Sequence, residues 1–463
     1  MSKWRELYQE IRTGIASGQI PAGTKLPSTR DLADERKLSR STVITAVDQL
    51  TAEGFLESRP GSGTYVALGA GGPGKLSFSS PRRFASGGTT APGARQEGGL
   101  IDFRSGQPDL SCFPWSRWEK AERQARLKYG SDLLRYAKPE GLPGLRAAIA
   151  SYLGRVRGLS VDPERLLVCN GTTQAISLLA DIFASVGVHT VWLEDPVTAD
   201  IVEIFRGRGL GIHRAPVDDQ GLMTTELEPG GAGGWAGHVC FVTPSHQFPT
   251  GAVLSLNRRV QLIENFQTEG AWLIEDDYDS EFRFDGPPLA TLASLDPSRV
   301  VYIGTFSKTL APGLRTAYIH LPESLVERGR QGKWRNDLHN VPLIQAALAE
   351  FLDRGYYDLH VRTMRKLYQR KRDLIRETFR DHIPGAVFTG DSAGLHGRVI
   401  LGHGMVDQPF LDRCQKVGVR VYPVAAHAAE PSRGRQDFIL GYGHLSFEEI
   451  IEGLGRLRRA LEG

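Results

Sequence analysis

Short apolar patterns separated by turns run through the first 68 residues. Leu7, Ile11 and Ile15 recur at helical spacing, which predicts an amphipathic helix over residues 4–17. Residues 19–27 contain two prolines and a glycine and are typical of a turn. The chain is therefore expected to begin with one helix followed by a break.

Two serines mark the starts of two further helices. A serine just before a helix accepts a hydrogen bond from an N–H group of the first turn. Ser28 precedes a short helical pattern that includes Leu32, and Ser39 precedes a longer one over residues 40–53. Gly54 follows, and glycine commonly ends helices. We expect two short helices joined by a turn.

The pattern changes to that of a β-hairpin over residues 55–66. Apolar and polar positions alternate, and the run Pro-Gly-Ser-Gly at residues 60–63 interrupts them. A helix, two short helices and a hairpin form the layout of a winged helix-turn-helix. In that layout, the second short helix enters the major groove of DNA by its N-terminal end.

This layout selects a set of candidate DNA contacts. Arginines pair with phosphates, and glycines at the hairpin tip permit close approach to the DNA backbone. The alternative is a small helical domain that binds protein, with these charges as a solvated surface. The predicted DNA-facing set consists of Lys25, Arg30, Arg40, Thr42, Arg59, Ser62 and Gly63.

Residues 69–99 hold nine glycines and three prolines and almost no apolar periodicity. Such a composition cannot bury enough surface to offset the entropy of ordering the chain. We interpret it as a flexible linker. It separates a DNA-binding domain over residues 1–68 from a larger domain over residues 100–463.

Apolar runs of strand length alternate with amphipathic helical patterns in the larger domain. Runs that are apolar on both faces are typical of a parallel sheet covered by helices, so an α/β fold with a mainly parallel sheet is expected. Functional side chains should gather where such strands end. The predicted strands are 166–169, 190–193, 239–242, 272–274 and 300–303.

Composition narrows the classes of protein without revealing a partner. Lys and Arg total 56 and Asp and Glu total 53, a formal charge of +3, which excludes histone-like and acidic disordered chains. No apolar run approaches the roughly 20 residues needed to span a bilayer, and the N-terminus lacks an apolar signal core. The cysteines, at positions 112, 169, 240 and 414, form no CxxC pair. This argues against a disulfide framework or a zinc site and favours the cytoplasm.

The most specific chemical pattern spans residues 304–315. Lys308 follows a buried strand among small and hydroxylic residues, and Arg315 lies seven positions later. A lysine there is usually a surface residue. This pairing instead suits an amine that forms a Schiff base and a guanidinium that binds phosphate.

Two other strand ends carry polar side chains. Residues 275–277 are acids, and a carboxylate there can pair with a protonated pyridine nitrogen. Acids at a strand end can also bind magnesium, but no Walker-type glycine loop accompanies these. Residues 170–174 lead from a strand into a helix, where free N–H groups favour phosphate.

Three stretches of the first domain resemble the DNA-binding domain of GntR-type regulators. They are LPSTRDLA from Leu26, LSRSTVITAV from Leu38 and RPGSGTYV from Arg59. The large domain is similar to fold-type I, class I/II aminotransferases, which bind pyridoxal phosphate. The two domains in this order look like the MocR family of bacterial transcription regulators, with EDDYDSEFR from Glu275 and TFSKTLAPGLR from Thr305 as characteristic segments.

The resemblance implies a role for individual residues. Lys308 would hold the cofactor as a Schiff base, Asp276 would pair with its pyridine nitrogen, and Tyr278 would hydrogen-bond its phenolic oxygen. Tyr136 would reach the phosphate of a partner subunit, which implies a domain-swapped homodimer; the alternative is a buried aromatic. The residues implied to hold the phosphate are Thr172, Thr173, Thr305 and Arg315.

Three positions depart from the aminotransferase pattern. Thr198 stands where an aromatic usually stacks on the pyridine ring, and Phe248 stands where an asparagine is usual. Ile439 replaces the arginine that binds the substrate's α-carboxylate, and isoleucine cannot pair with a carboxylate. Arg433 and Arg435 are the nearby substitutes.

Three functions are compatible with this sequence. The first is a regulator that binds operator DNA and senses pyridoxal phosphate itself, or an amine or amino acid, at Lys308. The second is a working aminotransferase with an appended DNA-binding domain. The third is a DNA-binding protein whose large domain only dimerises, against which the intact Lys308, Asp276, Tyr278 and Arg315 argue.

Overall fold

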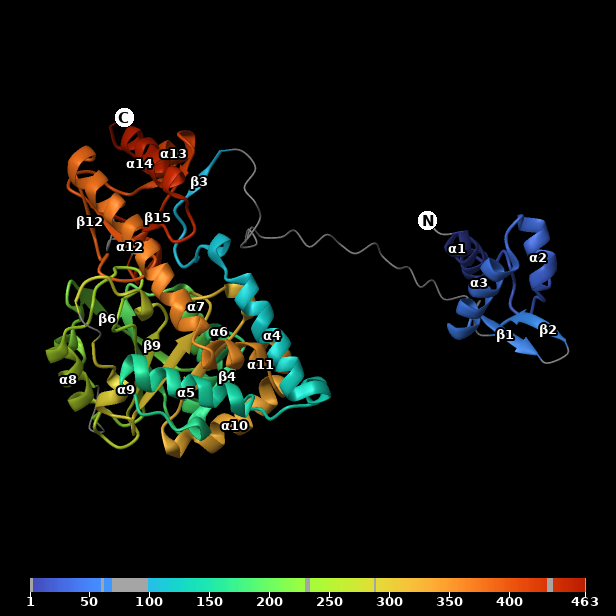
Figure 1. Cartoon of the computed structure of the whole chain (residues 1–463), viewed down its shortest axis with the longest axis horizontal. Coiled ribbons are helices and arrows are strands. Elements are labelled where there is room, and N and C mark those ends of the chain that lie inside the picture. The colour runs from blue at the N-terminus through green and yellow to red at the C-terminus, as the bar shows by residue number, and fades with distance from the viewer. Residues whose placement is uncertain are drawn as a thin grey trace. The chain divides into compact units, whose positions relative to one another are not determined.

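The computed structural model describes two compact units of the chain, Met1–Ala94 and Arg95–Gly463 (Figure 1). The described residues are 3–59, 62–68, 99–229, 234–286, 289–430 and 436–462. The predicted linker at 69–99 lies outside them except for Gly99.

The small unit has the predicted order of three helices and a hairpin. Ser28 accepts a hydrogen bond from the N–H of Asp31, and Ser39 accepts one from the N–H of Thr42, so both predicted helix caps are confirmed. Strand β1 pairs with β2 in antiparallel fashion. The elements are α1 (Lys3–Ala16), α2 (Thr29–Arg36), α3 (Arg40–Ala52), β1 (Leu56–Arg59) and β2 (Gly63–Val66).

One apolar core holds these elements together. Ile15 from α1, Val43 and Leu50 from α3 and Val66 from β2 are fully buried in it. The helical spacing of these residues places them on one face of each helix. The opposite face of α3 is therefore left for solvent or a partner.

An eight-stranded sheet forms the centre of the large unit, in the order β4-β11-β10-β9-β8-β5-β6-β7. All five predicted strands are present and run in the same direction, while β11 is antiparallel to β4 and β10, and β7 is antiparallel to β6. The prediction missed β6, β7 and β11. The strands are β4 (Leu166–Cys169), β5 (Thr190–Asp195), β6 (Gly211–Asp218), β7 (Gly221–Leu222), β8 (His238–Val242), β9 (Trp272–Asp277), β10 (Val300–Thr305) and β11 (Ala317–His320).

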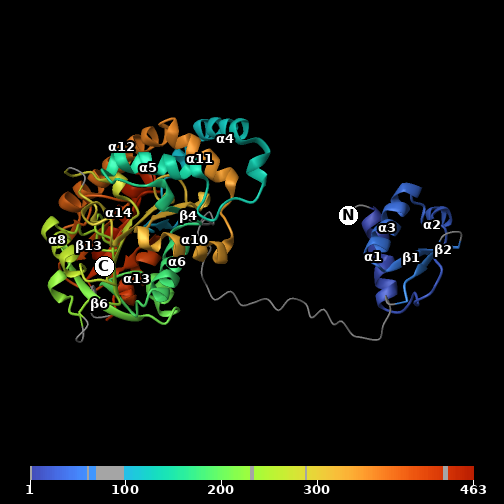
Figure 2. The same cartoon turned by 90° about the horizontal axis from the view of Figure 1, so that it is seen from below.

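Helices cover both faces of this sheet. Figure 2 shows α4, α5 and α11 on one side of β4 and α6 on the other. Strands buried in this way need no polar face, which explains their apolar sequences. The helices are α4 (Trp115–Tyr129), α5 (Pro143–Arg157), α6 (Thr172–Ser185), α7 (Ala199–Arg206), α8 (Leu256–Asn265), α9 (Leu292–Leu295), α10 (Glu323–Asp337), α11 (Pro342–Asp353) and α12 (Tyr356–His382).

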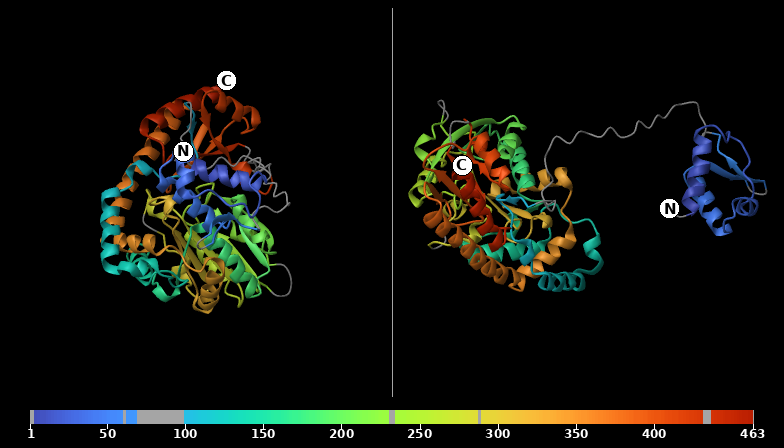
Figure 3. Two further views of the ribbon diagram at one scale, coloured as in Figure 1. Left: turned by 90° about the vertical axis from the view of Figure 1, so that its right-hand side faces the viewer. Right: turned by 90° about the horizontal axis from the view of Figure 1, so that it is seen from above.

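A C-terminal lobe packs at one end of the large unit (Figure 3). Its sheet has the order β12-β13-β16-β15, and β3 pairs with β14 in parallel, so the start of the large unit returns to the lobe. The elements are β3 (Ile101–Asp102), β12 (Ala386–Thr389), β13 (His396–Leu401), α13 (Gln408–Lys416), β14 (Val419–Arg420), β15 (Tyr422–Pro423), β16 (Asp437–Gly441) and α14 (Phe447–Glu462).

No described helix is both long and apolar enough to cross a membrane. All four cysteines are free, with Cys112 exposed and the other three buried.

Two glycines fix the contact between the loop after β8 and the loop after β12. Gly251 and Gly390 both have positive φ, at 73° and 64°. A Cβ atom on Gly251 would collide with the backbone of Gly390, and a Cβ atom on Gly390 would collide with the carbonyl of Thr250. Only residues without a side chain allow this approach.

We expect Gly390→Ala to destabilise the large unit by about 2 kcal/mol or more, because it adds both backbone strain and overpacking. Thermal unfolding followed by circular dichroism measures this effect. Gly455→Ala is the matched control, since Gly455 lies within α14 and has no atom near the added Cβ. An unchanged unfolding midpoint for Gly390→Ala would contradict the assignment.

Candidate functional site

Two candidate residues lie at the carboxyl ends of neighbouring parallel strands. Asp276 is within the last two residues of β9, and Lys308 lies just beyond the end of β10. Asp276 of β9 pairs in register with Ile303 of β10, and Lys308 follows the end of β10 by three residues. The Lys308 Nζ atom donates a hydrogen bond to the carbonyl of Gly106 at 2.9 Å. The first segment of the large unit therefore closes over the strand ends.

The surroundings of Lys308 favour loss of its proton. Burial lowers the pKa of Lys308, and the carboxylates of Asp279 and Asp276 offset only part of that effect. The guanidinium of Arg315 acts in the same direction as burial. A lysine amine needs its free electron pair to attack a carbonyl, so this environment suits a nucleophilic lysine.

Asp276 is a buried carboxyl group with spare hydrogen-bonding capacity. Burial raises its pKa to about 8, the nearby charge of Asp277 adds to the effect, and Lys308 opposes it. Its Oδ1 atom is buried and has no hydrogen-bond partner among the described residues. A buried oxygen atom of this kind can still accept a hydrogen bond from a ligand group.

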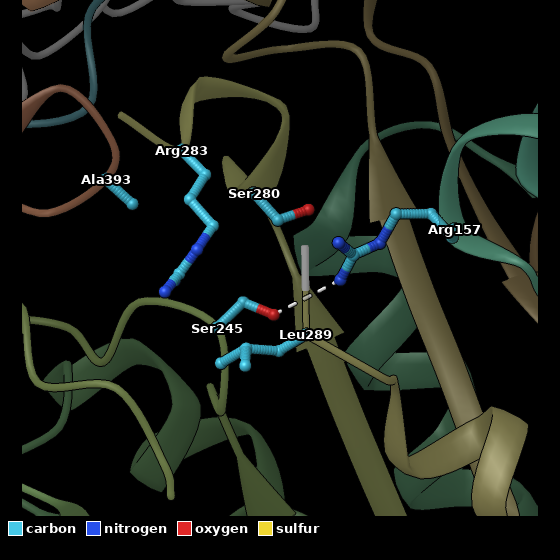
Figure 4. Close-up of a pocket in the computed structure, with 6 residues that line it drawn as sticks. All are labelled: Arg157, Ser245, Ser280, Arg283, Leu289 and Ala393. Atoms are coloured by element: carbon cyan, nitrogen blue, oxygen red, sulfur yellow. Dashed lines mark hydrogen bonds between the residues drawn. The ribbon is translucent and has the colours of Figure 1, made fainter. Parts of the chain in front are cut away.

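Asp277 faces the opposite side of β9, because successive side chains of a strand alternate. Its Oδ2 atom accepts a hydrogen bond from the Tyr302 hydroxyl at 2.6 Å and forms an ion pair with Arg157 of α5 at 2.8 Å. Figure 4 shows Arg157 reaching Ser245 across a small pocket, with Arg283 entering from the other side. Asp277 is thus paired with an arginine, whereas Asp276 keeps an oxygen atom with no hydrogen-bond partner among the described residues.

A candidate anion site lies where β4 turns into α6. Gly171 precedes α6 with a φ of 90°, and the Nη2 atom of Arg315 donates to the Asn170 carbonyl at 2.9 Å. A Cβ atom on Gly171 would collide with the Arg315 guanidinium. Free N–H groups at a helix start together with an arginine favour a phosphate.

The residues predicted to hold the phosphate differ in their surroundings. Thr172 is the first residue of α6, beside Gly171 and Arg315, whereas the side chain of Thr173 is exposed. Thr305 ends β10, and its hydroxyl accepts a hydrogen bond from the N–H of Ser307 at 3.1 Å.

A buried pair of His246 and Asp279 adjoins Tyr278. The His246 Nδ1 atom lies 3.0 Å from Asp279 Oδ2, and its Nε2 atom lies 3.1 Å from the Gly390 carbonyl. Burial alone would lower the pKa of His246, but Asp279 and Gly390 raise it overall. Both partners offer oxygen acceptors to the two ring nitrogens, an arrangement that favours the protonated ring.

The sequence interpretation missed this pair. Asp279 lies in the EDDYDSEFR segment, and the sequence predictions give no role to it or to His246. Tyr278 is held by the same group, since its hydroxyl donates to the His246 carbonyl at 2.8 Å. Histidine and aspartate 33 positions apart give no sequence signal for their pairing.

His396 of β13 completes a cluster of metal-capable side chains. Ligand atoms of His246, Asp279 and His396 lie within 4.8 Å of one another, and Phe248 packs against His396 with ring centroids 5.2 Å apart. Burial lowers the pKa of His396 well below its ordinary value. Both nitrogens of His246 already have hydrogen-bond partners, and His396 meets His246 through a ring contact with centroids 4.5 Å apart.

Two of the positions that depart from the aminotransferase pattern lie in or beside regular elements of the large unit. Thr198 immediately precedes α7, and Ile439 is buried in β16 opposite Arg398. Arg398 donates to Asp437 at 2.6 Å, so its charge is already paired. Arg433 and Arg435 lie outside the described residues.

Tyr136 is 87% exposed and contacts the ring of His339 at a centroid distance of 5.8 Å. The alternative interpretation of Tyr136 as a buried aromatic is therefore wrong. An aromatic this exposed is available to a partner.

The predicted DNA-facing residues lie in two parts of the small unit. Lys25, Arg30 and Arg40 are exposed, and Thr42 contacts the Ser39 hydroxyl at 2.7 Å at the start of α3. The remaining members belong to the hairpin.

Tyr65 organises the hairpin, and the predicted set did not include it. The Arg59 guanidinium lies 4.6 Å from the centre of its ring, and Lys25 Nζ lies 5.9 Å from it. The Ser62 hydroxyl lies 2.7 Å from the Tyr65 hydroxyl. Gly63 has a φ of 119°, and residues 60–61 lie outside the described residues.

Two family models match the chain. Residues 3–66 match the bacterial regulatory proteins of the gntR family, and residues 99–435 match aminotransferase class I and II. The second match covers more than half of the chain. It agrees with the fold of the large unit.

Solved structures agree with this fold. The multiple substrate aminotransferase of Thermococcus profundus superposes with a TM-score of 0.72 at 24% identity, covering 79% of this chain and 92% of that chain. LysN, an alpha-aminoadipate aminotransferase of Thermus thermophilus, superposes with a TM-score of 0.69 at 26% identity and the same two coverages.

Curated relatives are regulators by name. The chain is 34% identical to the probable rhizopine catabolism regulatory protein MocR of Rhizobium meliloti, over 98% of this chain and 93% of that protein. It is 32% identical to the pyridoxine biosynthesis transcriptional regulator PdxR of Corynebacterium glutamicum, over 84% and 82%. Because both domain matches occur in one chain and a MocR protein aligns with it nearly from end to end, the chain belongs to the MocR family of bacterial transcription regulators.

Proposed function

We propose that this regulator holds pyridoxal phosphate at Lys308 and that occupancy of this site controls its binding to operator DNA. The observation that carries the proposal is the pairing of a desolvated Lys308 with a buried, incompletely bonded Asp276. Both lie at the strand ends of an aminotransferase fold, a family generally dependent on pyridoxal phosphate.

The residues fit the three functional parts of the cofactor. The unpartnered Asp276 Oδ1 atom suits a protonated pyridine nitrogen. Tyr278 is the candidate partner of the phenolic oxygen, and its hydroxyl would leave the His246 carbonyl in order to donate there. The start of α6 and Arg315 suit the phosphate. The proposed phosphate ligands are Thr172, Thr173, Thr305 and Arg315.

The protein's own groups prepare this chemistry. Pyridoxal phosphate supplies an aldehyde that condenses with a primary amine and releases water. Lys308 supplies the amine, and burial keeps a larger fraction of it unprotonated than in water. With the cofactor bound, the Asp276 carboxylate would hold a proton on the pyridine nitrogen, and the Gly106 carbonyl orients the Lys308 Nζ atom.

The effector is pyridoxal phosphate itself, or an amine or amino acid that reacts with it. Ile439 offers no charge for a carboxylate, which favours an effector without one. A relative named for the regulation of pyridoxine biosynthesis fits a cofactor-related signal. A working aminotransferase with an appended DNA-binding domain is the alternative, which the names of the relatives disfavour.

The remaining assignments complete the proposal. Each chain consists of a DNA-binding domain over residues 1–68, a flexible linker over 69–99 and an effector domain over 100–463. Two such chains form a domain-swapped homodimer that operates in the cytoplasm. The exposed Tyr136 supports a contact with a partner subunit. The DNA-facing set is the seven residues predicted from the sequence.

Borohydride reduction tests the attachment at Lys308. Wild-type protein incubated with pyridoxal phosphate is expected to absorb in the visible range and, after reduction, to carry the phosphopyridoxyl mass on the peptide that contains Lys308. Lys308→Ala should lose both signals, whereas Lys120→Ala, at an exposed lysine of α4, should keep them. Retention of the visible band in Lys308→Ala would refute the assignment.

The pH dependence of stability tests the environment of Asp276. Burial raises the folded-state pKa to about 8 from an ordinary 3.8, so the folded protein binds the proton more tightly than the unfolded chain. Stability from this group is therefore complete below about pH 4 and is lost as the pH rises towards 8. Within that window, each rise of one pH unit lowers the free energy of unfolding by about 1.4 kcal/mol.

Asp276→Asn cannot ionise, so without added cofactor its unfolding midpoint should fall less steeply between about pH 5.5 and 8 than that of the wild type. Asp219→Asn, at an exposed aspartate, should follow the wild type. Parallel pH profiles for Asp276→Asn and the wild type would contradict a buried, protonated Asp276.

A further inference from the structure

The outward face of α3 carries an apolar residue among polar ones. The core-facing residues Val43 and Val47 are buried, whereas Ile44 is 39% exposed. Ile44 stands four positions after Arg40 and four before Asp48, so the three share one face of the helix. Ile44 therefore lies outside the buried core that its neighbours form.

The next residue strengthens the apolar character of this patch. The Thr45 hydroxyl donates to the Ser41 carbonyl at 3.0 Å, so its hydrogen-bonding group is used within the helix. The second turn of α3 consequently offers carbon atoms of Ile44 and Thr45 to a partner. The first turn, which carries the Arg40 cation, offers charge and hydrogen bonds.

We propose that Ile44 packs against the C5-methyl group of a thymine in the operator and makes the protein specific for that base. This inference rests on the DNA-binding function proposed above and adds a determinant of sequence. In the major groove, only thymine presents a methyl group, and apolar side chains are its natural contacts.

Charge along α3 supports DNA as the occupant and limits the size of the contact. Arg40 at the start of the helix attracts the phosphate backbone, while Asp48 one turn beyond Ile44 would be repelled by it. The helix therefore meets DNA over its first two turns. Ile44 is the large apolar side chain exposed within that stretch.

The test replaces single thymines by deoxyuridine, which pairs identically but lacks the methyl group. The probe is duplex DNA from the region upstream of the protein's own gene, trimmed to the segment that the full-length protein protects from nuclease. Each thymine is replaced in turn, and affinity is measured by fluorescence anisotropy at physiological salt with unrelated DNA as competitor.

We expect one thymine per half-site at which the replacement weakens wild-type binding about three- to fivefold, the effect of one buried methyl group of about 0.8 kcal/mol. Ile44→Ala should bind the duplex with thymine at that position and the duplex with deoxyuridine there with equal affinity. Ile44→Val, which keeps an apolar side chain, should retain most of the discrimination. Because Ile44 is exposed, both variants should unfold at the wild-type temperature.

Arg40→Ala separates failure of this inference from failure of the proposed function. Arg40→Ala should weaken binding to the thymine duplex and to the deoxyuridine duplex by the same factor, so the ratio of the two affinities should not change. If binding is specific and depends on Arg40, but no thymine shows discrimination that Ile44→Ala removes, the inference is wrong and the DNA-binding proposal stands. A change of oligomeric state in Ile44→Ala without loss of discrimination would identify a protein partner and overturn it. Equal affinity for upstream and unrelated DNA would overturn both proposals.

Discussion

Buried charge at the carboxyl ends of β9 and β10 is the constraint on which the large unit depends. Ionised groups are costly to remove from water unless partners surround them. Arg157 comes from α5 to meet Asp277, and Lys308 donates to Gly106 in the segment that follows β3. Gly390, after β12, accepts a hydrogen bond from His246. Elements distant in the sequence therefore converge because the charges at these strand ends require them.

The same constraint leaves two groups of the site incompletely satisfied. Asp276 retains an oxygen atom without a hydrogen-bond partner among the described residues, and burial lowers the pKa of Lys308. A ligand that brings a protonated nitrogen and an anionic group would relieve both conditions. The neighbouring His246–Asp279 pair links this region to the C-terminal lobe, since His246 donates to the Gly390 carbonyl. A coupled, two-state response needs this kind of difference in interaction between states.

Local interactions were predictable from the sequence, and long-range pairs were not. Ser28 and Ser39 cap helices that begin at the next residue, so the signal and its effect are adjacent. The five central strands are buried on both faces and show it as apolar runs. By contrast, β11 is only four residues long, and its antiparallel place between β4 and β10 depends on partners far along the chain. The His246–Asp279 pair and the role of Tyr65 in the hairpin likewise depend on contacts that no spacing reveals.

The central claim is that occupancy at Lys308 alters DNA binding by a separate unit of the chain. The direct measurement is the affinity for the upstream DNA, titrated with pyridoxal phosphate and then with candidate amines, for the wild type and for Lys308→Ala. If the Lys308 site controls DNA binding, the affinity of the wild type changes about fivefold or more, which is the lower range of allosteric coupling, and that of Lys308→Ala does not change. An unchanged affinity of the fully loaded wild type, or an equal change in Lys308→Ala, would contradict it.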